Sequence, residues 1–156
     1  MGIISFQGAR SKTKKQDNTR IKVSDYMTKD LITFSPKQSV MEVINKLVKH
    51  KISGGPVVNE RNELLGIISE GDCIKQLNES RYYNMPIDDS TVEKFMVKDV
   101  ETIDGNASVF DAANKFLETK RRRFPIIEEG KLIGQISQKD VMKAALKMNS
   151  QRWREM

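Results

Sequence analysis

The chain has 156 residues and contains one cysteine, Cys73, and one histidine, His50. A single cysteine excludes a disulfide framework within the chain, which agrees with a reducing, cytoplasmic location. One histidine and one cysteine are too few ligands for a zinc site, and they leave only one possible base for a Ser-His-Asp arrangement. We therefore predict that the protein is not an enzyme, with His50 on the surface and Cys73 as a core thiol.

Two other classes of feature are missing. The sequence has neither a GxGxxG motif nor a Walker-type phosphate loop. It also lacks a run of about 18 apolar residues, which a transmembrane helix needs, and its first six residues are too short and too uncharged for a signal peptide. The absence of a transmembrane segment and of a signal peptide predicts that the protein has no membrane partner.

Charge is present in excess but is unevenly distributed. The formal net charge is +6 and the sequence pI is about 9.4. Against one acidic residue, Asp17, the first 22 residues carry six basic ones: Arg10, Lys12, Lys14, Lys15, Arg20 and Lys22. Two interpretations stay open for this basic tail, namely a solvated, disordered segment and a segment that docks on an acidic partner or nucleic acid.

The chain does contain an internal repeat. A shift of 69 residues places Val23–Val58 on Val92–Ile127, and 11 of these 36 aligned positions are identical. With one residue deleted near Arg61, the match continues at a shift of 68 and places Gly66–Asp72 on Gly134–Asp140. A two-fold internal repeat indicates two similar units that pack about a pseudo-two-fold axis, with paired clefts between them.

Each unit is predicted to be β-α-β-β-α, which makes the fold class α/β (α+β). In the first unit, a short extended piece at 30–34 precedes an amphipathic helix that begins after Ser39, with Glu42 completing a capping box. Two strands joined by a hairpin turn follow at 56–58 and 64–69, and a second helix comes after them. The second unit repeats these elements 68 or 69 residues later.

These elements divide the chain into five parts. A unit of about 60 residues is marginal alone, so we expect the pair of units to fold together. The predicted parts are a basic tail at 1–20, the first repeat at 21–78, a linker at 79–90, the second repeat at 91–147 and a C-terminal tail at 148–156.

One motif, Gly-Xaa-Ile-Ser-Xaa-Xaa-Asp, recurs where a strand passes into a helix. Its serines, Ser69 and Ser137, can cap the following helix, whose N-terminal N–H groups and partial positive charge suit phosphate or hydroxyl-rich ligands. Its aspartates, Asp72 and Asp140, lie in the first helical turn, where a carboxylate can accept hydrogen bonds from both hydroxyls of a ribose. The alternative is that Ser-x-x-Asp is only a helix cap. Its occurrence in both units favours a ligand site.

At residues 21–147 the chain resembles a tandem pair of CBS domains, a regulatory nucleotide-sensing module. The resemblance rests on three doubled motifs in the family's order and spacing. They are the Met-x-Lys-Asp-(Leu/Val)-x-Thr start, the Pro-Val-Val and Pro-Ile-Ile strands, and the Gly-x-Ile-Ser-x-x-Asp ends.

The resemblance implies both an architecture and a class of ligand. In that family two repeats pack through their sheets into one module, and two modules commonly form a flat, disc-like homodimer. Adenosine compounds (AMP, ADP, ATP and sometimes NAD or S-adenosylmethionine) lie in the clefts between repeats. By the family pattern, Asp72 and Asp140 bind ribose, and Ser69 and Ser137 bind ribose or phosphate.

In the family, the loop before the proline strand of the opposite repeat also contributes adenine and phosphate contacts. The two loops differ here. Arg121, Arg122 and Arg123 can clamp phosphates, with a solvated basic loop as the alternative. Ile52 and Ser53 offer an apolar shelf, backbone N–H groups and little charge.

We therefore expect two unequal clefts. One pairs Asp72 with the three arginines and prefers phosphates. The other pairs Asp140 with the Ile-Ser loop, near Thr33 and Ser35, and suits an adenosine with fewer phosphates.

The sequence thus predicts a stand-alone regulatory module of the energy-sensing kind. It requires no cofactor, binds an adenine nucleotide (AMP or ATP) as its regulatory ligand, and passes its occupancy to a partner protein or across a homodimer. The alternative is a basic nucleic-acid-binding protein that uses its tail, with the repeats as a dimerising scaffold. That alternative predicts binding that depends steeply on salt and is lost when residues 1–20 are deleted.

Overall fold

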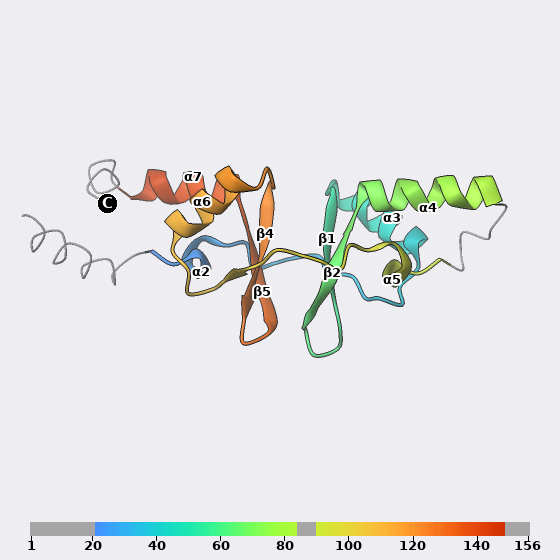
Figure 1. The fold of residues 1–156 in the computed structure, drawn as a ribbon, viewed down its shortest axis with the longest axis horizontal. Coiled ribbons are helices and arrows are strands. Elements are labelled where there is room, and N and C mark those ends of the chain that lie inside the picture. The colour runs from blue at the N-terminus through green and yellow to red at the C-terminus, as the bar shows by residue number, and fades with distance from the viewer. Residues whose placement is uncertain (1–20, 84–89, 149–156) are drawn as a thin grey trace, which may run out of the picture.

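The computed structural model describes residues 21–83 and 90–148, which form two α/β halves side by side (Figure 1). The predicted tail at 1–20, residues 84–89 of the predicted linker and residues 149–156 of the C-terminal tail lie outside the described residues. Within the described ranges, no helix has the length and apolar character that crossing a membrane requires.

The described elements confirm the predicted α/β class. β1 and β2 form an antiparallel hairpin in the first half. In the second half β3 is parallel to β4, which is antiparallel to β5. In chain order the elements are α2 (Val23–Tyr26), α3 (Val40–His50), β1 (Gly54–Val58), β2 (Leu64–Ser69), α4 (Glu70–Tyr83), α5 (Val92–Phe95), β3 (Ile103–Asp104), α6 (Val109–Glu118), β4 (Arg123–Glu128), β5 (Lys131–Ser137) and α7 (Gln138–Lys147).

The first helix of each repeat follows its sequence pattern. α3 begins after Ser39, whose Oγ accepts a hydrogen bond from the N–H of Glu42, and α6 begins with a complete capping box between Ser108 and Asp111. Three of the apolar positions spaced for one face of each helix are buried: Val40, Val43 and Leu47 in α3, and Val109, Ala112 and Phe116 in α6. Local pattern and burial agree here, as expected for an amphipathic helix.

The predicted first strands are shorter than expected. Residues 99–103 contribute only Ile103 of β3, and residues 30–34 contribute a single parallel bridge between Phe34 and Val57. The reason is that both stretches belong to longer segments that pass from one half to the other. We call residues 27–33 and 96–102 the crossing segments, because each pairs with one half near its start and leads directly into a residue, Phe34 or Ile103, that pairs with the other half.

The two repeats exchange their first helical turns through these crossing segments. Val23 of α2 is fully buried in the core of the second half, and its N–H donates to the carbonyl of Ala107 at 2.8 Å. Val92 of α5 is fully buried in the core of the first half, and its N–H donates to the carbonyl of Gln38 at 2.9 Å. Each core is therefore closed by a residue from the other repeat.

The glycine of the repeated motif is explained by this exchange. Thr28 and Gln135 share two backbone hydrogen bonds of 2.8 and 3.0 Å, which hold a crossing segment against β5 at Gly134. A Cβ at Gly134 would lie 2.8 Å from the carbonyl oxygen of Thr28, and one at Gly66 would lie 2.5 Å from that of Val97. Both glycines therefore allow a close approach of two backbones.

α4 is longer than expected, because it continues to Tyr83 and so includes residues 79–83 of the predicted linker. Its inner face accounts for the extension. Gln76 and Ser80 are buried, and Gln76 Nε2 donates to Ser90 Oγ at 2.9 Å. The helix thereby packs against the chain where it enters the second repeat.

Candidate functional site

In the first half, the Ser-x-x-Asp motif joins the end of β2 to the first turn of α4. The N–H and Oγ of Ser69 both donate to Asp72 Oδ2, at 2.8 and 2.9 Å. In return, the N–H of Asp72 donates to Ser69 Oγ at 3.4 Å. The side chains therefore hold each other at the helix start.

The second half repeats the arrangement at the start of α7. Ser137 donates from its N–H and Oγ to Asp140 Oδ2 at 2.9 and 3.0 Å, and the N–H of Asp140 donates to Ser137 Oγ at 3.2 Å. Asp140 is only 8% exposed. A capping box is thus present at both motifs. In both motifs, the two hydrogen bonds that the serine donates go to Oδ2 of the aspartate.

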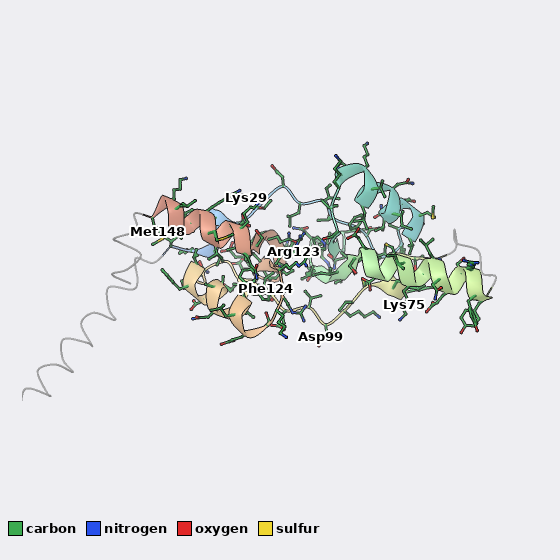
Figure 2. All side chains as sticks on the ribbon, turned by 90° about the horizontal axis from the view of Figure 1, so that it is seen from above. Lys29, Lys75, Asp99, Arg123, Phe124 and Met148 are labelled. Carbon is green, nitrogen blue, oxygen red and sulfur yellow. The ribbon has the colours of Figure 1, made fainter. Side chains whose placement is uncertain are left out.

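The arginine loop, residues 121–123, lies beside the motif of its own repeat. Strand pairing places Arg123 opposite Ser137, and Gln138 donates from its N–H and its Nε2 to two carbonyls of this loop, at 3.3 and 3.4 Å. The expected pairing of the arginines with Asp72 of the other half stays a prediction, because these neighbours within one hairpin do not exclude it. In a hairpin the residues before the first strand return beside the residues that end the second strand. Figure 2 shows Arg123 on the side of the second half that faces the first.

In the first half, Ile52 and Ser53 have the equivalent position. Gly54 pairs with Ser69, and the N–H of Glu70 donates to the carbonyl of Ser53 at 2.9 Å. Ile52 packs against the core of the first half. This loop therefore lies at the first turn of α4, and its expected pairing with Asp140 of the other half stays a prediction.

Thr33 and Ser35 are brought together, but at the other end of β1. They line a hollow of about 450 Å³ with the rest of residues 33–38 and with residues 58–60. The N–H of Phe34 donates to the carbonyl of Pro56, so this segment runs beside the strand away from Gly54 and hence from Ser69. The lining of this hollow includes neither motif aspartate.

A smaller cavity of about 180 Å³ lies between the two halves. It is walled by residues 64–66 of β2, by Lys98, Val100 and Thr102 of a crossing segment, and by Ile127 and Gly130 of the second hairpin. This volume is below the roughly 300 Å³ at which small-molecule sites begin. The cavity shows, however, that a crossing segment lines the space between the halves, a role that the repeat pattern alone did not suggest.

The sequence reasoning also missed Glu101. Its Oε1 lies 3.3 Å from Arg121 Nε, so an ion pair joins a crossing segment to the arginine loop. The signal was present in the repeat, because the equivalent positions in the first half are Ile32 and Ile52. An apolar pair in one repeat corresponds to an oppositely charged pair in the other.

The charges around the two helix starts differ in sign. The start of α7 is flanked by the three exposed arginines and by Lys139, whereas the start of α4 is flanked by the uncharged Ile-Ser loop and by Glu70. An anion such as a phosphate is therefore attracted to the start of α7 more strongly than to that of α4.

The residues considered for catalysis give no reactive site in the described ranges. Cys73 is buried, and its burial, with a further contribution from Asp72 and Glu70, raises the pKa of the thiol to about 11. The thiol is therefore protonated and inert near neutral pH. His50 is exposed at the end of α3, and the described residues contain no cluster of three His, Cys, Asp or Glu that could hold a metal ion.

Comparisons with known proteins agree with this architecture. The family model described as the CBS domain matches residues 23–79 and 92–147. CBSX1, a chloroplastic CBS domain-containing protein of Arabidopsis thaliana, is 32% identical over 152 residues, which cover 81% of this chain and 64% of CBSX1. Protein MJ1225 of Methanocaldococcus jannaschii is 28% identical over 92% of this chain, which spans only 52% of MJ1225.

Solved structures show the same fold with adenosine compounds bound. The crystal structure of CBSX2, also from Arabidopsis thaliana, in complex with AMP has a TM-score of 0.71 and 31% identity, covering 82% of this chain and 98% of that one. The CBS domain pair of protein MJ0100, in complex with 5′-methylthioadenosine and S-adenosyl-L-methionine, has a TM-score of 0.65 and 25% identity, covering 83% and 99%.

Proposed function

This chain belongs to the CBS domain family, and from that premise we propose that it is a regulatory module that binds adenosine-containing ligands at its Ser-x-x-Asp motifs. The observation that carries the proposal is the matched geometry of the two motifs. In each repeat the serine binds one oxygen of the aspartate at a helix start, and a loop lies beside it. The AMP complex of CBSX2 and the MJ0100 complex supply the class of ligand.

In this proposal each motif binds the ribose of the ligand. Oδ1 of Asp72 or Asp140 accepts hydrogen bonds from the ribose hydroxyls. Because Oδ2 is already fixed by the serine, the carboxylate is oriented before the ligand arrives, which lowers the entropic cost of binding. The partial positive charge of the helix start favours a neighbouring phosphate.

The neighbouring loops then decide which ligand each cleft prefers. The cleft lined by the arginine loop is the phosphate-preferring one and takes AMP, ADP or ATP. The cleft lined by Ile52 and Ser53 takes an adenosine with fewer phosphates or with a cationic substituent, such as S-adenosylmethionine.

We further propose that the module works by binding rather than by catalysis and acts as a homodimer. Exposed apolar side chains lie at matched positions of the two helix pairs, which face the same side of the molecule (Figure 1). Val48 and Ile74 on α3 and α4 are 74% and 64% exposed, and their counterparts Leu117 and Met142 on α6 and α7 are 85% and 59% exposed. A second copy related by two-fold symmetry covers both faces at once.

The dimer is tested by sedimentation of the full chain and of Leu117→Glu. We expect the wild type to sediment as a dimer and the variant as a monomer, because a buried carboxylate without a partner opposes association. A wild-type monomer at tens of micromolar protein, or a variant that stays dimeric, contradicts this arrangement.

The ligand site is tested by calorimetric titration of AMP, ATP, NAD and S-adenosylmethionine into the wild type, Asp72→Asn and Asp140→Asn. Loss of a charge-assisted hydrogen bond of about 1.5–3 kcal/mol predicts a roughly 10- to 150-fold weaker affinity at the altered cleft. Asp111→Asn is the matched control, because Asp111 forms the same capping box with Ser108 at the start of α6 but has no proposed ligand.

Two results contradict the ligand proposal. One is that none of the four compounds binds the wild type. The other is that Asp72→Asn and Asp140→Asn bind as Asp111→Asn does, which makes the motif only a helix cap. In either case the basic tail becomes the next candidate, and salt-dependent binding of nucleic acid is its test.

A further inference from the structure

An exposed ion pair connects the arginine loop to a crossing segment. Arg121 Nε lies 3.3 Å from Glu101 Oε1, and the two side chains are 48% and 41% exposed. The position of Glu101 is set by its neighbour, because Lys115 Nζ donates to the carbonyl of Thr102 at 3.0 Å. Arg121 itself belongs to the loop that Gln138 holds at the start of α7. Glu101 therefore reaches an arginine of the proposed phosphate-binding loop.

The first half has no such pair. Its equivalent residues, Ile32 and Ile52, are partly buried and pack against the hydrophobic core. The fold therefore does not require charges at these two positions. An explanation for Glu101 and Arg121 has to come from something that distinguishes the second half from the first.

We propose that Glu101 is a specificity-determining residue of the cleft that the arginine loop lines, and that it holds Arg121 until a ligand phosphate replaces it. The inference rests on the proposed function and adds to it a competition between the Glu101 carboxylate and the ligand phosphate for Arg121. A guanidinium that is paired with a carboxylate is partly neutralised, so only a group with comparable negative charge can take it over. A phosphate does so, whereas an uncharged 5′-hydroxyl does not.

The magnitude of the competition follows from the exposure of the pair. An exposed ion pair contributes up to about 1 kcal/mol. Removing the carboxylate therefore raises the affinity for a phosphate-bearing ligand by at most about five-fold. The competition is electrostatic and lies near the surface, so it weakens in 1 M salt, where the screening length is about 3 Å. Glu101 thus lowers the affinity for AMP modestly and leaves that for adenosine unchanged.

The test compares AMP and adenosine binding by calorimetry in the wild type, Glu101→Gln, Arg121→Gln and the double variant. We expect Glu101→Gln to bind AMP two- to five-fold more tightly and adenosine equally well. Arg121→Gln is expected to lose AMP affinity, and Glu101→Gln to have no effect in that background. The control is Glu128→Gln, which removes the same charge at the far end of β4 from the arginine loop.

The outcomes separate this inference from the proposed function. If neither AMP nor adenosine binds the wild type, both the inference and the proposed function are contradicted. If AMP binds and Glu101→Gln behaves as Glu128→Gln does, the competition is refuted while the ligand site stands. If Glu101→Gln weakens AMP binding, Glu101 contacts the ligand directly and the competition is again refuted. A ligand-free measurement supports the pairing if the Arg121 Nε–Hε resonance shifts in Glu101→Gln, and refutes it if the resonance does not move.

Discussion

The sharpest test of the interlocked architecture is to fill the space at Gly134. A Cβ at this position would lie 2.6 Å from Met27 Sδ and 2.8 Å from the carbonyl oxygen of Thr28. The methionine side chain can move aside, but the carbonyl is held by its hydrogen bond to the N–H of Gln135. Gly134→Ala therefore forces the crossing segment away from β5.

The cost can be estimated from the contacts that change. Overpacking by one methyl group costs about 1–3 kcal/mol, and weakening the two hydrogen bonds between Thr28 and Gln135 adds about 1 kcal/mol. The alanine stabilises the protein by about 0.4–1 kcal/mol because it restricts the unfolded chain. We expect a net loss of about 2–3 kcal/mol, which corresponds to a fall in Tm of roughly 4–12 °C for a chain of this size.

Urea and thermal unfolding, followed by circular dichroism, measure this loss. The matched control is Gly71→Ala, because a Cβ there meets nothing closer than Ser69 Oγ at 3.7 Å. That substitution lies within α4 and should stabilise the helix by up to about 1 kcal/mol. A Gly134→Ala protein within about 0.5 kcal/mol of the wild type would falsify the close docking of the crossing segment on β5.

Two further predictions concern other parts of the fold. Ser108→Ala removes the cap of α6 and should lower the free energy of unfolding in urea by about 1 kcal/mol, with a neutral result arguing against the capping box. Because burial raises the pKa of the Cys73 thiol to about 11 from 9.0, the folded state keeps its proton where the unfolded state loses it. Stability should therefore fall as pH rises from about 9 to 11, and Cys73→Ala should remove that dependence in pH-resolved unfolding. At pH 8 a thiol reagent should label Cys73 slowly in the native protein and quickly in urea, whereas fast native labelling contradicts its burial.

Much of the fold was predictable because the repeat and the helical periodicity report the same elements twice. Ser39 and Ser108 cap the helices that their spacing indicated. The exchange of α2 and α5 was not predictable in the same way. A four-residue helical turn carries no signal for the distant core in which Val23 or Val92 is buried, because that choice depends on tertiary packing.

The candidate site was predictable from the sequence only in part. Ser69 and Asp72 were recognised as a possible cap and ligand site, and the structure holds them as a cap. The pairing of each loop with the aspartate of the opposite repeat stays a prediction. Two antiparallel strands joined by a short turn bring the residue before the first strand to the residue after the second. Hairpin geometry thus places each loop beside the serine of its own repeat, whereas its partner across the cleft depends on how the two halves pack.

The interlock also bears on how occupancy of one cleft can reach the rest of the molecule. Val23 and Val92 each complete the core of the other repeat, so neither half can fold with its own residues alone and the described chain should unfold in one transition. The residues between Val97, which shares two hydrogen bonds with Ile67 of β2, and Glu101, which pairs with Arg121, form a short covalent link from one half to the other. A ligand that takes Arg121 from Glu101 releases one end of that link. Regulation then requires only that the protein binds the ligand with different affinity when Glu101 is paired with Arg121 and when it is released. A ligand shifts an equilibrium by its differential binding to the two states.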